Sequence, residues 1–360
     1  MSEPSGDPGG GPSSLGRLRT SRDTSQPTMR NVAELAGVSA MTVSRALRDD
    51  PTVLPKTRKR VHEAAQQLGY RRNELARSLR VRGTSGMVGL AVTNLANPFY
   101  AHLALGVETV IAARGMKVVV SNTGDDVERE RELVNDLAAH RVDGIVVIPS
   151  SNDQRHLDPA RLGGIPVVFA ARPPLSIDAD CVLLDDFGGA HEATTHLLDA
   201  GHERIAFLGP PALWTSAERL RAFRDALTDA GVALDEKLVR CNQKEVETAE
   251  AAARELLALD DAPTAFFCAN SRNTIGAYRA LRSAHLNSAL SGFDDFELAD
   301  MLDLPLEVVT YDTAAMGRLA AELLLARIDS NKSGAVSPPR RVVLPTRLIR
   351  YGSTDAETLS

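Results

Sequence analysis

The stretch AELAGVSAMTVSRAL, residues 33–47, decides the fold of the N-terminal part of this chain. It has the pattern of an apolar helix that ends at Gly37, where glycine readily adopts the positive φ of a tight turn. A second helix begins within two residues, because Ser39 is a residue type that caps helix N-termini. In that second helix Val43 and Leu47 are four residues apart and can pack inward on one face. The sequence therefore predicts two short helices joined by a glycine turn.

The second helix leaves small, polar and cationic side chains outside its apolar face: Ala40, Met41, Thr42, Ser44 and Arg45. This arrangement is typical of a helix-turn-helix, whose second helix enters the major groove of DNA. An arginine there can bind guanine, small apolar groups can contact thymine methyls, and hydroxyls can reach bases or phosphates. The alternative is a generic three-helix bundle in which this face is only solvated.

The charge distribution supports a nucleic-acid partner for this segment. Residues 28–83 carry 12 Lys and Arg against 5 Asp and Glu, whereas residues 84–360 carry a net charge of −13 in a chain whose net charge is −6. The basic segment continues the helical pattern with a third helix from about Lys56 to Leu68 and a short fourth helix, NELARSLR, at 73–80. A basic helical module on an acidic body indicates DNA binding, although a solvated charged face is the simpler alternative.

After Gly86 the periodicity changes to strand-length apolar runs that alternate with amphipathic helices. Four of these runs are MVGLAV, GIVVIPS, RIAFLG and TAFFCA. Repeated units of this kind predict parallel sheets with helices on both faces, and their number favours two Rossmann-like lobes with a cleft where the strands end. The predicted fold is thus an all-α helix-turn-helix headpiece followed by a two-lobed α/β domain.

Longer stretches carry a family resemblance. MRNVAELAGVSAMTVSRALRDDPTVLPKTRKRVHEAAQQLGYRRNELARSL, and further along NPFYAHLALGVE, RVDGIVVIPS, GHERIAFLG, GFDDFELADML and MGRLAAELLLARI, closely resemble the LacI–GalR family of bacterial transcription regulators. The resemblance covers about residues 28–352. It implies a homodimer on a near-palindromic operator and a periplasmic-binding-protein-like (type I) sensor whose two lobes are joined by three crossovers.

The resemblance and the composition together predict the domain organisation. We expect a disordered arm at 1–27, a headpiece at 28–83 with a hinge helix at 73–80, an effector-binding and dimerisation domain at 84–352, and a flexible tail at 353–360. The two lobes are expected at about 84–185 plus 312–335, and at about 186–311 plus 336–352. The tail lacks heptads, which favours a dimer over a coiled-coil tetramer.

The resemblance also assigns DNA contacts. Residues 73–80 are similar to a hinge helix that orders on operator DNA and inserts Leu79 into the minor groove, where an apolar wedge kinks the duplex. Core packing is the alternative for Leu79. The predicted DNA contacts are Thr28, Ser39, Ala40, Met41, Thr42, Ser44, Arg45, Asn73, Arg77 and Leu79.

Effector contacts are implied in the same way, from family positions that line the cleft. They are Phe99, Tyr100, Ser150, Arg172, Trp214, Thr215, Arg219, Asn270, Asp294 and Tyr311. Aromatic rings, amides, carboxylates and arginines together suit a sugar or sugar derivative. Lys244 stands where the family often has an aromatic residue, which leaves a phosphorylated or acidic ligand open beside the simpler interpretation of a surface lysine.

Other classes of protein fit less well. No apolar run is long enough to span a membrane, and the N-terminus lacks the apolar segment of a secretory signal, so we expect a cytoplasmic protein. A periplasmic-type binding protein without DNA function is the alternative, but it needs such a signal. The HEATTH stretch spaces His191 and His196 five residues apart, whereas zinc enzymes need four. We therefore predict a repressor that is not an enzyme and has no cofactor or metal.

Overall fold

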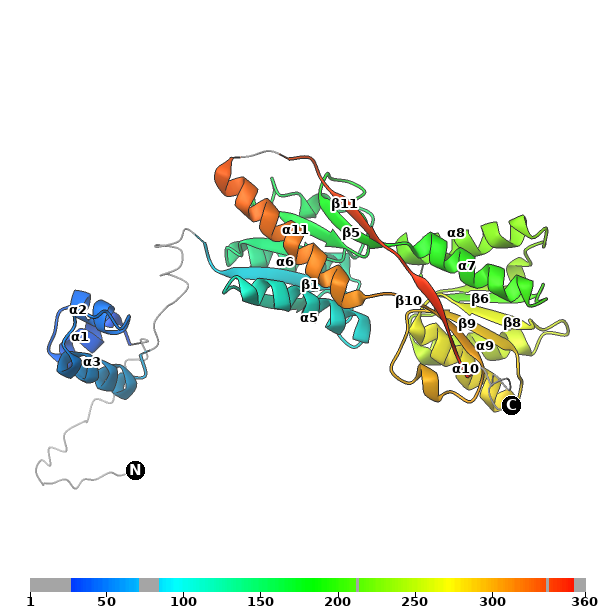
Figure 1. Cartoon of the computed structure of the whole chain (residues 1–360), viewed down its shortest axis with the longest axis horizontal. Coiled ribbons are helices and arrows are strands. Elements are labelled where there is room, and N and C mark those ends of the chain that lie inside the picture. The colour runs from blue at the N-terminus through cyan, green and yellow to red at the C-terminus, as the bar shows by residue number, and fades with distance from the viewer. Residues whose placement is uncertain (1–26, 71–83, 212–213, 335–336, 353–360) are drawn as a thin grey trace, which may run out of the picture. The chain divides into compact units, whose positions relative to one another are not determined.

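The computed structural model describes residues 27–70, 84–211, 214–334 and 337–352 (Figure 1). The chain separates into two compact units, Met1–Glu74 and Leu75–Ser360. None of the helices in these described ranges is both long enough and apolar enough to cross a membrane.

Residues 27–70 of the first unit form three helices: α1 (Met29–Ala36), α2 (Ala40–Ala46) and α3 (Pro55–Leu68). Thr28 caps α1, which ends at Gly37 with φ of +63°. Ser39 caps α2 by accepting the Thr42 N–H at 3.1 Å. Val43 of α2 is fully buried and packs with apolar residues of the other two helices. The predicted pair of short helices around a glycine turn is confirmed.

Ser39→Ala should destabilise the start of α2 by about 1 kcal/mol, because the Thr42 N–H loses its acceptor. Hydrogen exchange of the α2 amides in the full-length protein measures this directly. Ser39→Asp is the matched control, since aspartate retains a capping oxygen and should leave exchange nearly unchanged. Equal exchange in all three proteins would contradict the assigned cap.

The first lobe of the second unit is built on a six-stranded parallel sheet in the order β11-β5-β4-β3-β1-β2. Its strands are β1 (Met87–Val92), β2 (Lys117–Asn122), β3 (Gly144–Val147), β4 (Val167–Ala170), β5 (Asp180–Leu184) and β11 (Arg341–Leu344). Its helices are α5 (Pro98–Ala113), α6 (Val127–Ala139), η1 (Arg155–Leu157) and α11 (Thr313–Ser333). Strands β3, β4 and β5 are buried along their whole length, as expected for a sheet covered on both faces.

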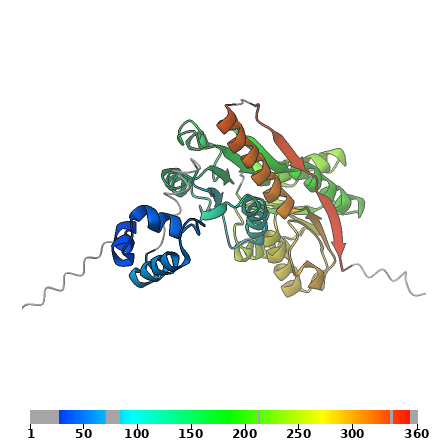
Figure 2. The ribbon, with the colours of Figure 1, turned by 60° about the vertical axis from the view of Figure 1, so that its left-hand side comes forward.

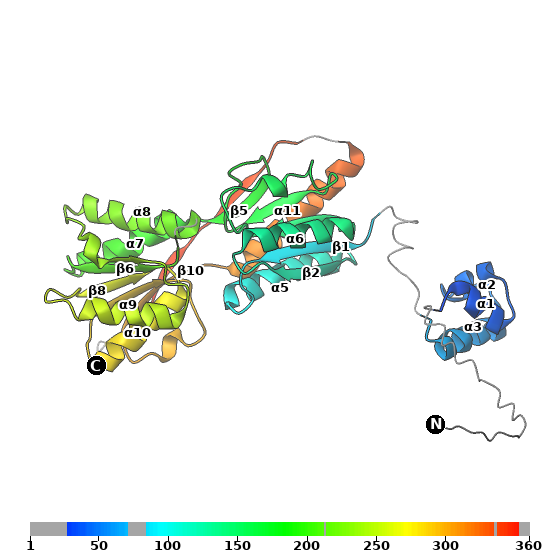
Figure 3. The same cartoon turned by 180° about the vertical axis from the view of Figure 1, so that it is seen from behind.

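The second lobe repeats this plan with the strand order β12-β10-β9-β8-β6-β7. Its strands are β6 (Ile205–Gly209), β7 (Val239–Cys241), β8 (Ala265–Cys268), β9 (Ala289–Phe293), β10 (Leu306–Thr310) and β12 (Arg347–Tyr351). Its helices are α7 (Asp186–Asp199), α8 (Trp214–Asp229), η2 (Glu236–Leu238), α9 (Val246–Leu257), α10 (Ser271–Ala284) and η3 (Ala299–Met301). Figure 3 shows α7 and α8 together beside β6, and α6 beside β1 in the first lobe.

Two sequence predictions are wrong at the C-terminus: the lobe boundary between residues 335 and 336, and two sheets that are both parallel. The stretch RVVLPTRLIR is not one strand: β11 pairs with β5 in the first sheet, whereas β12 pairs antiparallel with β10 in the second (Figure 2). Pro345 separates them because proline has no N–H to continue a ladder. The last crossover between lobes therefore follows Leu344, not residue 335, and the second sheet is mixed rather than parallel.

Helices α5 and α11 cross unusually closely at two glycines. A Cβ atom on Gly106 would lie 2.1 Å from the Ala314 carbonyl oxygen, and one on Gly317 would lie 2.1 Å from the Leu103 carbonyl oxygen. Only glycine fits at these positions. This contact fixes α5, whose first turn carries Phe99 into the cleft described below.

Candidate functional site

Helix α2 presents the residues predicted to contact DNA. Met41 is 65% exposed, Ala40 and Arg45 are exposed, and Thr42 and Ser44 are half-buried. These side chains occupy the part of α2 that its buried Val43 and Ala46 leave outside the core. Three further predicted contacts, Asn73, Arg77 and Leu79, lie outside the described residues.

Two of the predicted DNA contacts, Thr28 and Ser39, are the N-caps of α1 and α2. The Thr28 hydroxyl donates to the Asn31 side-chain oxygen at 2.6 Å, and the Ser39 hydroxyl lies 2.9 Å from the Thr42 hydroxyl. Each hydroxyl therefore has a structural partner already. A phosphate contact from either would come in addition to this capping role.

The arginines of the first unit differ in whether their guanidinium groups already donate hydrogen bonds within the fold. Arg58 donates to the Asp50 carbonyl at 2.9 Å, and Arg48 donates from Nε to the Ser44 carbonyl at 3.0 Å. Arg45 is exposed at the end of α2. Its guanidinium can reach a base edge, where a bidentate contact to guanine reads sequence.

The second unit encloses a cleft of about 540 Å³ at the carboxyl ends of strands from both sheets. In open α/β sheets this edge is where ligands bind, because chain reversals there leave a crevice. The lining residues are Thr93, Asn94, Asn97, Phe99, Tyr100, Asn122, Gly124, Asp125, Ile148, Ser150, Ala171, Arg172, Leu184, Pro210, Pro211, Thr215, Ser216, Arg219, Lys244, Glu245, Ala269, Asn270, Arg272, Asp294 and Tyr311.

Nine of the ten predicted effector contacts line this cleft. The exception is Trp214, which is half-buried at the first position of α8 and is not among the lining residues. Sequence reasoning missed Asn94, Asn122, Asp125 and Arg272. Their signal was available, since Asn122 ends a strand and the others lie within a few residues of a strand end.

Arg219 is the most constrained side chain in the cleft. It is only 5% exposed, and its Nε donates to Asp186 Oδ1 at 2.9 Å. Its Nη1 donates to the Ala269 carbonyl at 2.6 Å and to Asp294 Oδ1 at 3.3 Å. The Phe293 ring lies 3.5 Å from the guanidinium carbon. The guanidinium thus joins α7, β8 and β9 at the edge of the cleft.

Asp294 is also held by the phenol of Tyr311, which donates to Asp294 Oδ1 at 2.7 Å. Burial raises the pKa of Tyr311 well above its usual range, so the phenol remains a donor. Asp294 has φ of +69°, and Ala171, after the corresponding strand of the other lobe, has φ of +60°. Left-handed backbone at non-glycine residues is strained and occurs often at ligand sites.

The cations of the first lobe and of the cleft margin are also paired. Arg172 Nη1 donates to Asp125 Oδ1 at 3.0 Å and to the Pro149 carbonyl at 2.6 Å. Arg272 forms an ion pair with Glu245. Lys244 is exposed and is the one lining cation without an ion pair in the described part of the chain.

Burial raises the pKa of Asp186 to about 6, although Arg219 acts in the opposite direction. Between about pH 4 and pH 6, Asp186 is therefore protonated in the folded protein but ionised in the unfolded chain, where its pKa is that of an ordinary aspartate. By linkage, the free energy of unfolding falls as the pH rises through this window, by at most about 1.4 kcal/mol per pH unit from this group.

Asp186→Asn should remove that contribution. The difference in free energy of unfolding between wild type and variant, measured by denaturant titration from pH 4 to pH 7, should favour the wild type more strongly toward low pH. Asp225→Asn, an exposed aspartate on α8, is the control. A difference that grows toward high pH would contradict the raised pKa.

Comparisons with known proteins agree with both halves of this architecture. Residues 28–73 match the model for bacterial regulatory proteins of the lacI family, and residues 85–350 match the model for periplasmic binding proteins and the sugar binding domain of the LacI family. The HTH-type transcriptional regulator CelR of Thermobifida fusca is 36% identical over 90% of this chain and 97% of its own length.

Two solved structures extend the likeness. A CelR–cellobiose complex covers 91% of this chain and 100% of its own, with 32% identity and a TM-score of 0.68. The lac repressor dimer bound to operator and the anti-inducer ONPF covers 91% of this chain and 99% of its own, with 25% identity and a TM-score of 0.74.

Proposed function

This chain belongs to the LacI family of bacterial regulatory proteins, and we propose that it is a repressor whose operator affinity is set by a neutral sugar in the cleft. Helix α2, with Arg45 exposed at its end, supports sequence reading in a major groove. A regulator that binds genomic DNA acts in the cytoplasm and needs no catalytic group. Its relatives are transcriptional regulators, which supports a function without enzymatic activity.

The neutral character of the effector rests on one observation, the internal pairing of charges in the cleft. Arg172, Arg219 and Arg272 each contact a carboxylate of the protein. The groups left for a ligand are amides, hydroxyls and aromatic rings, which match the hydroxyls and the apolar faces of a sugar. An anionic ligand would have to break existing ion pairs or rely on the exposed Lys244 alone.

The size of the cleft and one relative favour a disaccharide. A cavity of about 540 Å³ lies within the range of small-molecule sites. The similar structure of CelR was determined as a complex with cellobiose. We therefore propose a neutral disaccharide such as cellobiose as the effector class.

Thermal unfolding of the full chain with glucose, ribose, cellobiose, maltose and glucose 6-phosphate tests this proposal. A neutral disaccharide should raise the melting temperature, and glucose 6-phosphate should not. Stabilisation by the sugar phosphate alone would overturn the neutral effector. A duplex enriched from random DNA then serves as the operator probe, and the stabilising sugar should change its affinity about 5- to 150-fold.

A homodimer is part of this proposal, and an open sheet edge supports it. Among the strands that the structure describes, β2 pairs only with β1, and its Val119 and Val120 are 39% and 41% exposed. Leu105 of α5, the helix that packs beside β2, is 62% exposed. Exposed apolar edge strands are pairing surfaces, so we propose that this face receives a second copy of the chain.

Val120→Lys should raise the dimer dissociation constant at least about 10-fold, because a two-fold interface brings the new lysine of one subunit toward the same lysine of the other. Sedimentation equilibrium measures the dimer dissociation constant. Val343→Lys makes the same change on β11, at the opposite edge of the same sheet, and should leave the dimer intact. If both variants sediment as the wild type does, the interface lies elsewhere.

A further inference from the structure

One carboxylate in the first lobe is buried in a segment whose other charges are exposed. Helix α6 begins VERERELV, and Glu128, Arg129, Arg131 and Glu132 of this segment are exposed, whereas Glu130 has no exposed surface. Burying a carboxylate costs free energy unless hydrogen bonds compensate it. The hydrogen bonds that Glu130 makes must therefore offset the cost of burying its carboxylate.

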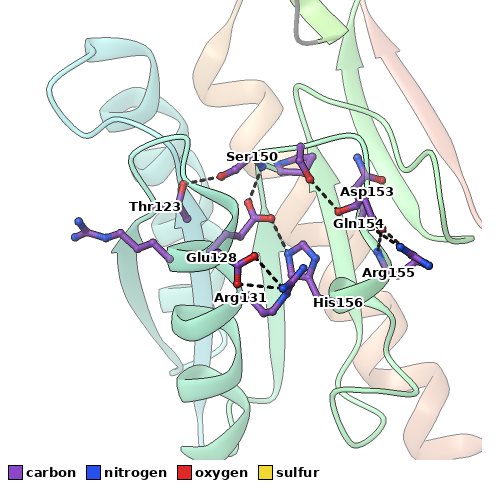
Figure 4. Close-up of polar contacts among 12 residues, drawn as sticks. Thr123, Glu128, Arg131, Ser150, Asp153, Gln154, Arg155 and His156 are labelled. Atoms are coloured by element: carbon purple, nitrogen blue, oxygen red, sulfur yellow. Dashed lines mark hydrogen bonds and ion pairs between the residues drawn. The ribbon is translucent and has the colours of Figure 1, made fainter.

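Glu130 holds two points of the segment that follows β3. Its Oε2 accepts the Ser150 N–H at 2.7 Å, and its Oε1 lies 2.8 Å from His156 Nε2. Figure 4 shows Ser150 and His156 both directed toward α6, with Thr123 beside Ser150. The Ser150 and Thr123 hydroxyls are 3.0 Å apart, so one donates to the other. Hydrogen bonds to a charged carboxylate are stronger than those between neutral groups. The Glu130 carboxylate also lies in the first turn of α6, where the helix dipole stabilises a negative charge.

The same segment is fixed from its other side by Gln154, which is 1% exposed. Its side-chain amide donates to the Pro173 carbonyl at 3.0 Å and accepts the Leu175 N–H at 2.7 Å. The segment from Ser150 to His156 is thus held between α6 and the chain that follows β4. Ser150 lines the cleft, whereas Glu130, His156 and Gln154 do not.

We propose that Glu130 is a positioning residue for effector recognition: it sets the place of Ser150 in the cleft wall without touching the ligand. Because its carboxylate accepts the Ser150 N–H, it fixes the backbone that carries the Ser150 hydroxyl. That hydroxyl and the hydroxyl of Thr123 share one hydrogen bond, which leaves the pair able to offer one more hydrogen to a ligand oxygen. This inference rests on the proposed function, in which the cleft binds a sugar.

Glu130→Gln tests the role with little change of shape. Glutamine removes the negative charge and replaces one of the two oxygens with an amide nitrogen, so the charge-assisted hydrogen bond from the Ser150 N–H is lost in either orientation of the amide. In the full-length protein we expect the dissociation constant for the panel sugar that stabilises the wild type, cellobiose first, to rise at least about 10-fold in calorimetry. Operator affinity without sugar should stay within about twofold of the wild type. Glu128→Gln, an exposed change on the same helix turn, should alter neither quantity.

A double-mutant cycle separates positioning from general stability. Ser150→Ala removes the hydroxyl but keeps the backbone N–H, so Glu130→Gln should change sugar affinity less than about twofold in that background. A merely structural Glu130 would still weaken binding there and would lower the melting temperature and operator affinity together. Hydrogen exchange gives a second measurement if Glu130→Gln does not fold, because the sugar should slow exchange of the Ser150 amide in the wild type. Unchanged exchange would overturn the proposal.

A failure of the proposed function can be distinguished from a failure of the positioning role of Glu130. If no sugar of the panel binds the wild type, the proposed function is wrong and the positioning role falls with it. If a sugar binds the wild type and Glu130→Gln binds it equally well, only the positioning role is wrong.

Discussion

Arg219→Leu is expected to abolish the response of operator binding to sugar and to lower the free energy of unfolding by about 3–5 kcal/mol. The guanidinium is buried between Asp186 and Asp294, so its removal takes the shared cation away from two carboxylates, of which Asp186 is almost fully buried. It also removes the donor to the Ala269 carbonyl, which follows β8. Both effects act on the cleft wall that a sugar must contact.

Denaturant titration measures the stability change, and mobility shift with and without cellobiose measures the response. Arg221→Leu is the control on the same helix: Arg221 is exposed, pairs with Glu218 and Asp225, and should cost no more than about 1 kcal/mol. A variant at Arg219 that kept both full stability and sugar response would contradict the role assigned to this network.

Arg45→Ala is expected to reduce discrimination between operator and random duplex by about 5- to 150-fold, the equivalent of one good base contact. Arg45 is exposed at the end of α2 and is not part of the core of the first unit, so its loss should remove a base contact without disturbing the fold. Affinity for random DNA should fall only slightly and should remain strongly dependent on salt, since the other cations still neutralise phosphates.

Arg48→Ala is a matched control because it removes the same charge three residues away. Its Nε is bonded to the Ser44 carbonyl, so its loss should weaken operator and random DNA about equally. Competition binding at several salt concentrations gives the ratio of operator affinity to random-DNA affinity for each of the two variants. Retention of full selectivity by Arg45→Ala, or an equal loss in Arg48→Ala, would show that α2 reads DNA with another face.

Local rules predicted those parts of the structure that depend on neighbouring residues. The cap at Ser39, the turn at Gly37 and the burial of Val43 follow from short-range patterns. The cleft lining was also largely predictable, because residues at the ends of parallel strands gather at one edge of a sheet.

The features that the sequence did not predict depend on pairings between distant residues. Arg219 reaches Asp186 33 positions away and Asp294 75 positions away, so the neutralisation of its charge is invisible in the linear pattern. Glu130 is one charge among several in the α6 segment, and only the fold shows that it is buried. The sequence likewise did not show that β11 pairs with β5 and β12 with β10, because an apolar strand can pair with either of these two strands.

That split strand has a consequence for synthesis of the protein. On one side of each sheet the outermost strand, β11 or β12, is translated after all the other strands of that sheet. Neither sheet can gain this edge strand until residues 341–351 have been made, so both lobes complete their sheets at nearly the same point of synthesis. A premature stop codon just before Arg341 would expose an unpaired edge on β5 and on β10 at once, and quality-control proteases would meet one molecule with two defects.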